Sequence, residues 1–435
     1  MSAIKYFLVL VLLFTSPLLL ASPEIQSWKL KNGTRVLFVK ANDLPIVQIA
    51  VTFDAGGARD PVGKNGLSMM VAGMLEEGVP AMDADQIAAT FEDQGAIFSA
   101  SSSRDMLTLS LRSLSGDEYL KPVTAMFRKL MLTPTFPLES FERERSRALT
   151  GLKQAQADPG TLAQWNFFKA VYGDHPYAFP GEGTSKSLTL LQRLDLVKFH
   201  KRYFNGNNAV MIMVGDLGNR QARSLAKEIA GELPDGDKAA PLPDVVLPTK
   251  KNEQFMAFPS SQSHIRIGQP GMHRKDPDYF TLYVGNYILG GGGLVSRLSE
   301  TIREKEGLAY SVYSYFWPLR KEGPFLIGMQ TRNNQRDKAI SLLRSILKDF
   351  INNGPTQAEL DAAKQNLTGG FPLRIDSNKK IAGYLNVIGF YNLPLTYLDD
   401  FKDRINEVTV AKIKDAFKRR IDDGKLVTVV VGGKQ

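Results

Sequence analysis

The chain has 435 residues, 43% of them apolar and 23% charged, which is typical of a globular protein of about two to three domains. Its 54 Lys and Arg against 45 Asp and Glu give a net charge of +9. The basic residues form no long block and do not alternate with aromatic residues, so we expect no nucleic-acid partner. The chain contains no cysteine, which excludes disulfides, a lipid-modified cysteine and thiolate metal ligands.

The first 22 residues have the pattern of an export signal. Lys5 supplies a short basic region, residues 7–20 form a nearly unbroken apolar core, and Ala21 or Ser22 offers a small residue for cleavage. The apolar core is shorter than the ~20 residues that a membrane-spanning helix needs. We therefore expect an exported, periplasmic protein, which would contact a membrane only if this segment were retained as an anchor.

The first half of the mature chain, residues 23–232, is expected to mix strands and helices. Asn32-Gly33 predicts the turn of a β-hairpin over Trp28–Val39. Further strands are expected at 46–54, 96–100, 106–112 and 209–214, and helices at 66–77, 83–94, 117–130, 138–155, 161–171 and 195–204. The helix at 66–77 is apolar on nearly every side, so we expect it to be buried.

Residues 233–252 contain four prolines and little periodicity, which predicts a linker. The second half, residues 253–435, then repeats the order of elements. Strands are expected at 265–268, 325–331 and 426–431, and helices at 276–289, 294–305, 337–352, 357–367 and 409–420. Both halves end in a helix, a short polar loop and a strand that stops at Val-Gly. We interpret this as an internal duplication of two α+β halves, each a mostly antiparallel sheet backed by helices.

Residues 289–315 carry the most distinctive pattern of the second half. Leu294, Leu298 and Ile302 recur at helical spacing, and Gly307 suits a helix C-cap. The small, aromatic and β-branched residues from Leu308 onward predict a strand. The run Gly290–Gly293 lacks a following Gly-Lys-Ser/Thr, so we interpret it as a tight turn where two backbones pass closely, rather than as a phosphate loop.

Arg303 and Tyr310 stand out in this segment. A guanidinium and a phenol placed together could both donate hydrogen bonds to one peptide carbonyl or developing oxyanion. By spacing alone, a solvated charge and an aromatic at the core edge would fit equally well. However, the string from SRL through IREK to GLAYSV resembles the C-terminal half of the M16 (pitrilysin-like) metallopeptidases. In that family the matching Arg and Tyr hold the substrate.

The resemblance extends over nearly the whole mature chain. It implies two duplicated LuxS/MPP-like metallohydrolase-type domains that enclose a chamber. Active members carry H-x-x-E-H on an early helix, where two His bind zinc and the Glu activates water, and a Glu on a later helix completes the site. In this chain Met69 and Gly73 stand at the two His positions and Ala72 at the Glu position. The later Glu falls near Thr150 or Gly151.

The remaining candidate ligands do not replace this set. The adjacent carboxylates Glu76 and Glu77 should point in different directions on a helix. The four histidines are not spaced as ligands; they are His175, His200, His264 and His273. We expect a structural role for His175, in the HPYAF loop, and a solvated or capping role for His200. We therefore expect no metal or cofactor in this chain.

An emptied zinc site together with a retained Arg/Tyr pair resembles the non-catalytic subunit of two-subunit M16 peptidases. The resemblance implies a heteromeric zinc peptidase in which an H-x-x-E-H partner holds zinc, while Arg303 and Tyr310 orient the peptide substrate. Ser99 stands where active members commonly have Asn, in the strand that pairs with bound peptide, but edge pairing uses main-chain groups. The chain would not be an active enzyme alone.

Two other interpretations remain open. One is a binding or scaffold protein without a proteolytic role, like the M16-like core subunits of respiratory complexes. The other is an unaided hydrolase that uses Ser68, the Ser99–Ser103 run and Asp105. This hydrolase would need a histidine base, and no G-x-S-x-G or Ser/His pattern is present.

Overall fold

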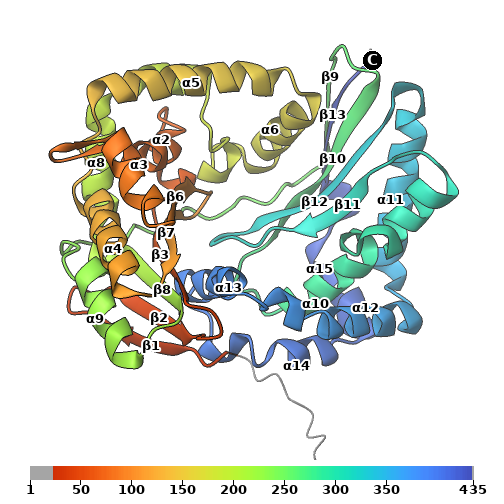
Figure 1. The fold of residues 1–435 in the computed structure, drawn as a ribbon. Helices are drawn as coiled ribbons and strands as arrows, with labels where there is room; N and C mark the ends of the chain where they lie inside the picture. The colour runs from red at the N-terminus through yellow and green to blue at the C-terminus, as the bar shows by residue number, and fades with distance from the viewer. Residues whose placement is uncertain (1–22, 434–435) are drawn as a thin grey trace, which may run out of the picture.

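The computed structural model describes residues 23–433, so the expected export signal lies outside the described part of the chain (Figure 1). Two sheets organise the fold. The first has the order β1-β2-β8-β3-β7-β6 and the second the order β11-β12-β10-β13-β9. The strands of the first sheet are β1 (Gln26–Lys29), β2 (Arg35–Lys40), β3 (Ile46–Phe53), β6 (Ile97–Ser102), β7 (Leu107–Leu114) and β8 (Ala209–Gly215). Those of the second are β9 (Asn252–Met256), β10 (Gln262–Met272), β11 (Val312–Phe316), β12 (Gly323–Arg332) and β13 (Val427–Val431).

The two sheets share one topology, which confirms the internal duplication. In the first sheet β2 pairs parallel with β8 and the other neighbours are antiparallel. In the second sheet β9 takes the place of β2, pairing parallel with β13, and the other neighbours are again antiparallel. The predicted hairpin is also present, because β1 and β2 pair antiparallel around Asn32-Gly33. The edge strands β6 of the first sheet and β11 of the second therefore occupy equivalent places.

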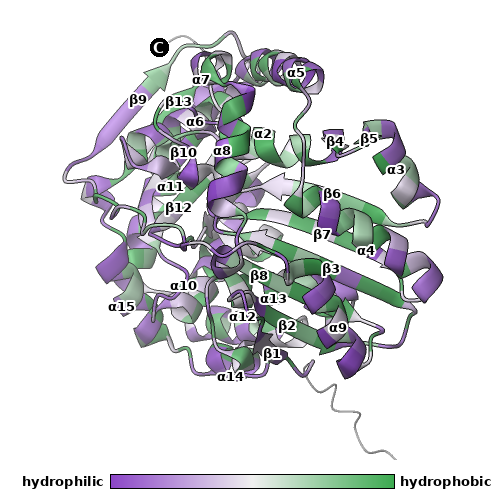
Figure 2. Ribbon diagram, turned by 90° about the vertical axis from the view of Figure 1, so that its left-hand side faces the viewer, coloured by the Kyte–Doolittle hydropathy of each residue, from purple (hydrophilic) through white to green (hydrophobic). Residues whose placement is uncertain are grey.

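Helices cover the faces of both sheets, and Figure 2 shows the hydrophobic colouring of the central strands between them. In the first half they are α2 (Leu67–Met74), α3 (Ala84–Glu92), α4 (Asp117–Leu132), α5 (Leu138–Gln156), α6 (Pro159–Tyr172), α7 (Ser185–Leu190), α8 (Arg193–Tyr203) and α9 (Asn219–Ala230). In the second half they are α10 (Tyr279–Asn286), α11 (Arg336–Asn353), α12 (Gln357–Gly369), α13 (Asn378–Phe390), α14 (Phe401–Asn406) and α15 (Val410–Arg420). All the predicted strands and most of the predicted helices are present. No helix within residues 23–433 is both long enough and apolar enough to cross a bilayer.

The helix predicted at 294–305 is wrong in its first part. Residues Gly293–Val295 form a 3-10 turn, and the helix starts only at Arg297 and continues as a π-helix at Ser299–Lys305. Ser296 is extended between them, with its hydroxyl donating to the carbonyl of Gly293 at 2.7 Å. Leu294 and Val295 are consequently 58% and 76% exposed, so the predicted apolar stripe loses its first turn.

One helix of each half packs on the sheet of the other half. Helix α6 of the first half packs on β10 and β13, and α13 of the second half packs on β8 and β3 (Figure 1). The approach is close on both sides. A Cβ on Gly389 of α13 would lie 2.6 Å from Val210, and one on Gly268 of β10 would lie 3.0 Å from the ring of Phe167. The sequence patterns did not predict this exchange.

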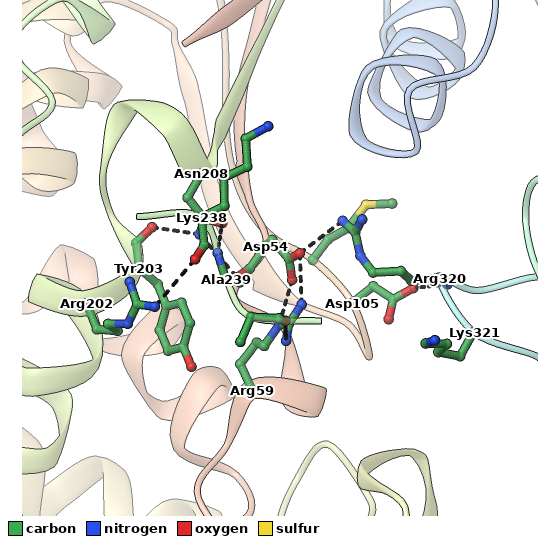
Figure 3. A network of polar contacts seen from close by, with 12 residues as sticks. Asp54, Arg59, Asp105, Arg202, Tyr203, Asn208, Lys238, Ala239, Arg320 and Lys321 are labelled. Atoms are coloured by element: carbon green, nitrogen blue, oxygen red, sulfur yellow. Dashed lines mark hydrogen bonds and ion pairs between the residues drawn. The ribbon is translucent and has the colours of Figure 1, made fainter. Parts of the chain in front are cut away.

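Polar contacts tie the linker and the second half to the first (Figure 3). Residues 234–251 form no helix or strand, yet Asn208 accepts a hydrogen bond from the amide of Ala239 at 3.0 Å. Asp54 pairs with Arg59 at 2.7 Å and, across the halves, with Arg320 at 3.0 Å. The linker is thus held against the protein, and the two halves are joined by a partly buried ion pair as well as by apolar packing.

Candidate functional site

Helix α2, which corresponds to the zinc helix of the resemblance, is capped by a buried carboxylate. Asp60 accepts hydrogen bonds from the amides of Gly66 at 2.7 Å and Ser68 at 2.8 Å. Burial raises the pKa of Asp60 to about 7, although the hydrogen bonds from Ser68 and Gly66 act to lower it. Gly66 takes φ +96°, a left-handed conformation that glycine adopts without strain, and the helix begins directly after it.

The two faces of α2 differ in exposure. Val71, Ala72 and Met74 face the sheet and are at most 3% exposed. Met69 is 49% exposed, and Gly73, one turn later on the same face, is also exposed. The expectation that the whole helix is buried is therefore wrong on this face, because the face opens onto a pocket instead of packing against core.

The pocket lies between α2 and α5 and has a volume of about 380 Å³. Met69, Gly73 and Gly151 all line it, so the structure brings together the positions at which the family resemblance expects two His and a Glu. Thr150 is not among the lining residues, and its hydroxyl donates to the carbonyl of Ser146 in its own helix at 3.0 Å. The rest of the lining is mainly small or apolar: Gly66, Met70, Ala148, Leu152, Ala155 and Leu188, with Glu144, Arg147 and Glu182.

These side chains do not fit a zinc ion. Zinc in proteins is held by imidazole, thiolate and carboxylate groups. The three ligand positions carry instead the thioether of Met69 and two glycines, Gly73 and Gly151, which have no side chain. Nowhere in residues 23–433 do three or more His, Cys, Asp or Glu side chains stand close enough to hold a metal. Glu77 is instead engaged in an ion pair with Arg143 of α5.

The histidines lie apart and have local partners. His175 accepts from the amide of Tyr177 at 3.1 Å through Nδ1, while its Nε2 lies 3.1 Å from the carbonyl of Pro243, so it is structural as predicted. His200 takes the capping role, one of the two roles expected from the sequence, because it bonds a carbonyl in the last turn of α4. Its Nε2 lies 2.8 Å from the carbonyl of Met131, and burial lowers its pKa. His200 is half-buried on α8, which packs against α2.

Arg303 and Tyr310 lie together on the surface of the second half. The chain reverses between them at Gly307, with φ +60°, and the amide of Gly307 donates to the carbonyl of Arg303 at 3.2 Å. Arg303 places its guanidinium carbon 4.6 Å from the centroid of the Tyr310 ring, within cation–π range. Tyr310 lies just ahead of β11, which begins at Val312 and not at Leu308 as predicted.

The exposure of this pair suits a ligand-binding role. Tyr310 is 78% exposed, and the side chain of Arg303 is 32% exposed while also pairing with Glu304 at 3.1 Å. The stacked ring holds the guanidinium in place, so both the phenol and the guanidinium can donate to a single acceptor brought to the surface. The neighbouring glycine run is only partly as predicted. A Cβ on Gly290 would lie 2.6 Å from the amide nitrogen of Ser314, so two backbones do pass closely there, but Gly290 and Gly291 end a π-helix instead of forming a tight turn.

The edge strand β6 lies beside α2. Its Ser102 hydroxyl donates to the hydroxyl of Ser68 on α2 at 3.0 Å. Ser99 faces Ser110 of β7, with the two hydroxyls 2.8 Å apart. Because β6 pairs with β7 on one side and with no other strand of the described chain, its second edge can accept a further strand.

This geometry does not support the interpretation of the chain as an unaided hydrolase. Ser68 contacts Ser102, and Asp105 accepts from the hydroxyls of Tyr177 at 2.7 Å and Tyr391 at 2.9 Å. Within residues 23–433, none of these side chains forms a hydrogen bond with a histidine. The serine run therefore forms part of an edge strand rather than a nucleophile–base pair.

Sequence reasoning missed two features of this site. Asp60 carries no cap pattern because it lies six residues ahead of Gly66 and reaches the helix through a loop. The pocket was missed because each of its glycines, Gly73 and Gly151, looks unremarkable in its own helix. The resemblance placed Gly73, and either Thr150 or Gly151, at ligand positions of one site, so it indicated that they lie close together but not that the space between them is an open pocket.

Comparisons with known proteins agree with this geometry. Residues 35–185 match the family model described as insulinase (peptidase family M16), and residues 191–367 match the one described as the peptidase M16 inactive domain. The chain is similar to the non-peptidase homolog YmxG of Helicobacter pylori, with 30% identity over 408 residues that cover 92% of each chain. It is also similar to the zinc protease PqqE of Helicobacter pylori, with 24% identity over 372 residues, 83% of this chain and 82% of that one.

Solved structures share the whole fold. The crystal structure of a peptidase M16 inactive domain from Pseudomonas fluorescens has 37% sequence identity and a TM-score of 0.91, over 94% of this chain and 98% of that one. The likeness includes both halves, and the positions of the zinc ligands in this chain carry none of the required side chains. The chain therefore belongs to the M16 peptidase family and is one of its non-peptidase homologues.

Proposed function

We propose that this chain is the substrate-holding subunit of a two-chain M16 zinc peptidase. The observation that carries the proposal is the exposed, stacked pair of Arg303 and Tyr310. A largely exposed tyrosine adds little to folding, so its placement against an ordered guanidinium suits recognition better than stability.

The two chains of this complex would have different roles because they carry different chemical groups. The partner supplies an H-x-x-E-H helix with zinc, which activates water toward the scissile peptide carbonyl. Arg303 and Tyr310 donate hydrogen bonds to the bound substrate and share the charge that develops on its oxygen. The free edge of β6 offers main-chain groups for an extended peptide.

The comparisons support a partner of the same family. Helicobacter pylori has both a non-peptidase homologue and a zinc protease that resemble this chain. A genome that encodes one inactive and one active member is what a two-chain enzyme requires. The export pattern of residues 1–22 suggests that both chains meet in the periplasm, and amino-terminal sequencing of the mature protein should find a start after Ala21 or Ser22.

The test is to copurify the chain with the H-x-x-E-H family member encoded in its own genome and to measure peptide hydrolysis by the complex. We expect Arg303→Ala to leave the complex assembled and to lower kcat/KM by about 100-fold, as loss of an oxyanion donor does. We expect Tyr310→Phe to give a similar loss, because only a hydroxyl is removed.

The matched control is Arg336→Ala. Arg336 also stacks on an aromatic ring, that of Phe255 at 5.1 Å, and also pairs with the next residue, Asp337 at 2.8 Å. Its replacement should leave hydrolysis unchanged. An assembled complex that cleaves peptides equally well with Arg303→Ala would reject the substrate-holding role, and a chain that never associates with an active member would favour the scaffold alternative.

A further inference from the structure

We propose that the emptied zinc position is a specificity pocket, in which an extended peptide paired with the free edge of β6 buries one apolar side chain. The inference rests on the proposed function only in taking a peptide as the ligand. It adds a binding site and a preference for apolar side chains. We expect active relatives to lack this site, because zinc and its ligands occupy the same position there.

Two glycines keep the pocket open. Gly73 lies in α2 and Gly151 in the middle of α5, and both line the cavity. A Cβ at either position would meet nothing within 4 Å, and neither residue has a positive φ. Glycine is therefore required there neither by backbone conformation nor by close packing, although it lowers helix stability. What the two glycines provide is space.

The pocket adjoins a surface built to pair with a strand. Helix α2 lies between α5 and β6 in both views of the molecule (Figures 1 and 2). Ser68 of α2 contacts Ser102 of β6, and the next residue of the helix, Met69, lines the pocket. An added strand on β6 presents every second side chain to the same face, so one of them can reach the cavity between the helices.

The size and chemistry of the pocket favour an uncharged apolar side chain. A cavity of about 150 Å³ lined by apolar groups holds benzene, and this pocket has a volume of about 380 Å³, so Leu, Met or Phe fits. The carboxylate at its rim, Glu144, is already paired with Arg147 at 2.7 Å and Arg143 at 3.2 Å. An anionic ligand side chain would lose its hydration and would meet two lining carboxylates, Glu144 and Glu182.

The experiment measures peptide binding by the mature chain without its partner. Fluorescein-labelled short peptides of Ser and Thr carry one central residue, Leu, Phe, Gly or Asp, and binding is followed by fluorescence anisotropy. We expect the Leu and Phe peptides to bind at least about tenfold more tightly than the Gly and Asp peptides. In Gly151→Leu, which fills the pocket, the Leu-to-Gly preference should fall to about one while the affinity for the Gly peptide is kept.

Gly383→Leu is the matched control, because Gly383 also lies inside a helix, α13, with nothing within 4 Å of a Cβ. It should retain the full preference of the wild type. A preference for Leu that survives in Gly151→Leu, equal binding of all four peptides, or no binding of any of them would each overturn the pocket assignment. The role of Arg303 and Tyr310 would stand in these cases, since it is measured separately in the assembled complex.

Discussion

The hydroxyl of Tyr391 donates a hydrogen bond of 2.9 Å to Oδ2 of Asp105, joining the end of the exchanged helix α13 to the loop after β6. Asp105 is 2% exposed and also accepts from the hydroxyl of Tyr177 at 2.7 Å and the amide of Arg320 at 2.7 Å. Burial and the nearby Asp105 charge raise the pKa of both tyrosines well above the usual range, so both remain donors. One buried carboxylate thus links three segments across the two halves.

Replacing this carboxylate should weaken the whole fold. Asp105→Ala leaves two phenols and one amide without an acceptor in a buried place, and we expect the free energy of unfolding to fall by on the order of 3 kcal/mol. Urea denaturation measures the loss. Tyr391→Phe, which removes one donor and keeps the ring, should cost about 1 kcal/mol. A loss below that of Tyr391→Phe in the Asp105 variant would mean that water replaces the missing carboxylate.

Asp60 should make stability depend on pH. Its pKa of about 7 in the folded protein lies above the ordinary 3.8, so the folded state holds the proton more tightly. The resulting stabilisation is complete below pH ~4 and is lost as the pH rises to ~7, a change of about 4 kcal/mol. Denaturation of the wild type and Asp60→Asn across this range should give a stability difference that declines with pH. Parallel curves would show that Asp60 stays charged throughout.

Filling part of the pocket should stabilise the protein. Gly151→Ala places a methyl group in open space within a helix, so we expect a gain of about 0.5–1 kcal/mol. Gly66→Ala is the opposing control, because Gly66 has φ +96° and its Cβ would lie 3.0 Å from the carbonyl of Glu182. We expect that change to lower the melting temperature. Equal effects of the two alanines would contradict the open space at Gly151.

The zinc site should be recoverable by substitution. Met69→His, Gly73→His and Gly151→Glu together place two imidazoles and a carboxylate around one pocket, so the triple variant should bind one zinc per chain. We expect an affinity more than about 100-fold above that of the wild type, measured by competition with a chelating dye.

A second triple variant tests which residue of α5 faces the pocket. It carries Thr150→Glu in place of Gly151→Glu, and Thr150 is turned toward its own helix. We expect its zinc affinity to be about tenfold lower than that of the Gly151 variant, because one ligand is lost. The reverse order of affinities would show that the later carboxylate belongs at position 150.

Local patterns in the sequence were enough for most of the secondary structure. Asn32-Gly33 predicted its hairpin, the repeated helix–loop–strand ending predicted the duplication, and Gly290 predicted a close backbone passage. These features depend on residues within a few positions of one another. The same holds for the Arg303/Tyr310 pair, since a short helix, Gly307 and the start of an edge strand place both side chains together.

Contacts between distant residues were not accessible in that way. The exchange of α6 and α13, the contact of His200 with the end of α4 and the junction at Asp105 depend on which apolar faces meet. Many pairings of such faces satisfy the same local periodicity. The pocket is the clearest case. Gly73 and Gly151 have no side chains, so neither adds an apolar or polar signal to the pattern of its own helix. They form one site only because α2 and α5 pack side by side, and this packing arises from the buried faces of those helices rather than from the glycines.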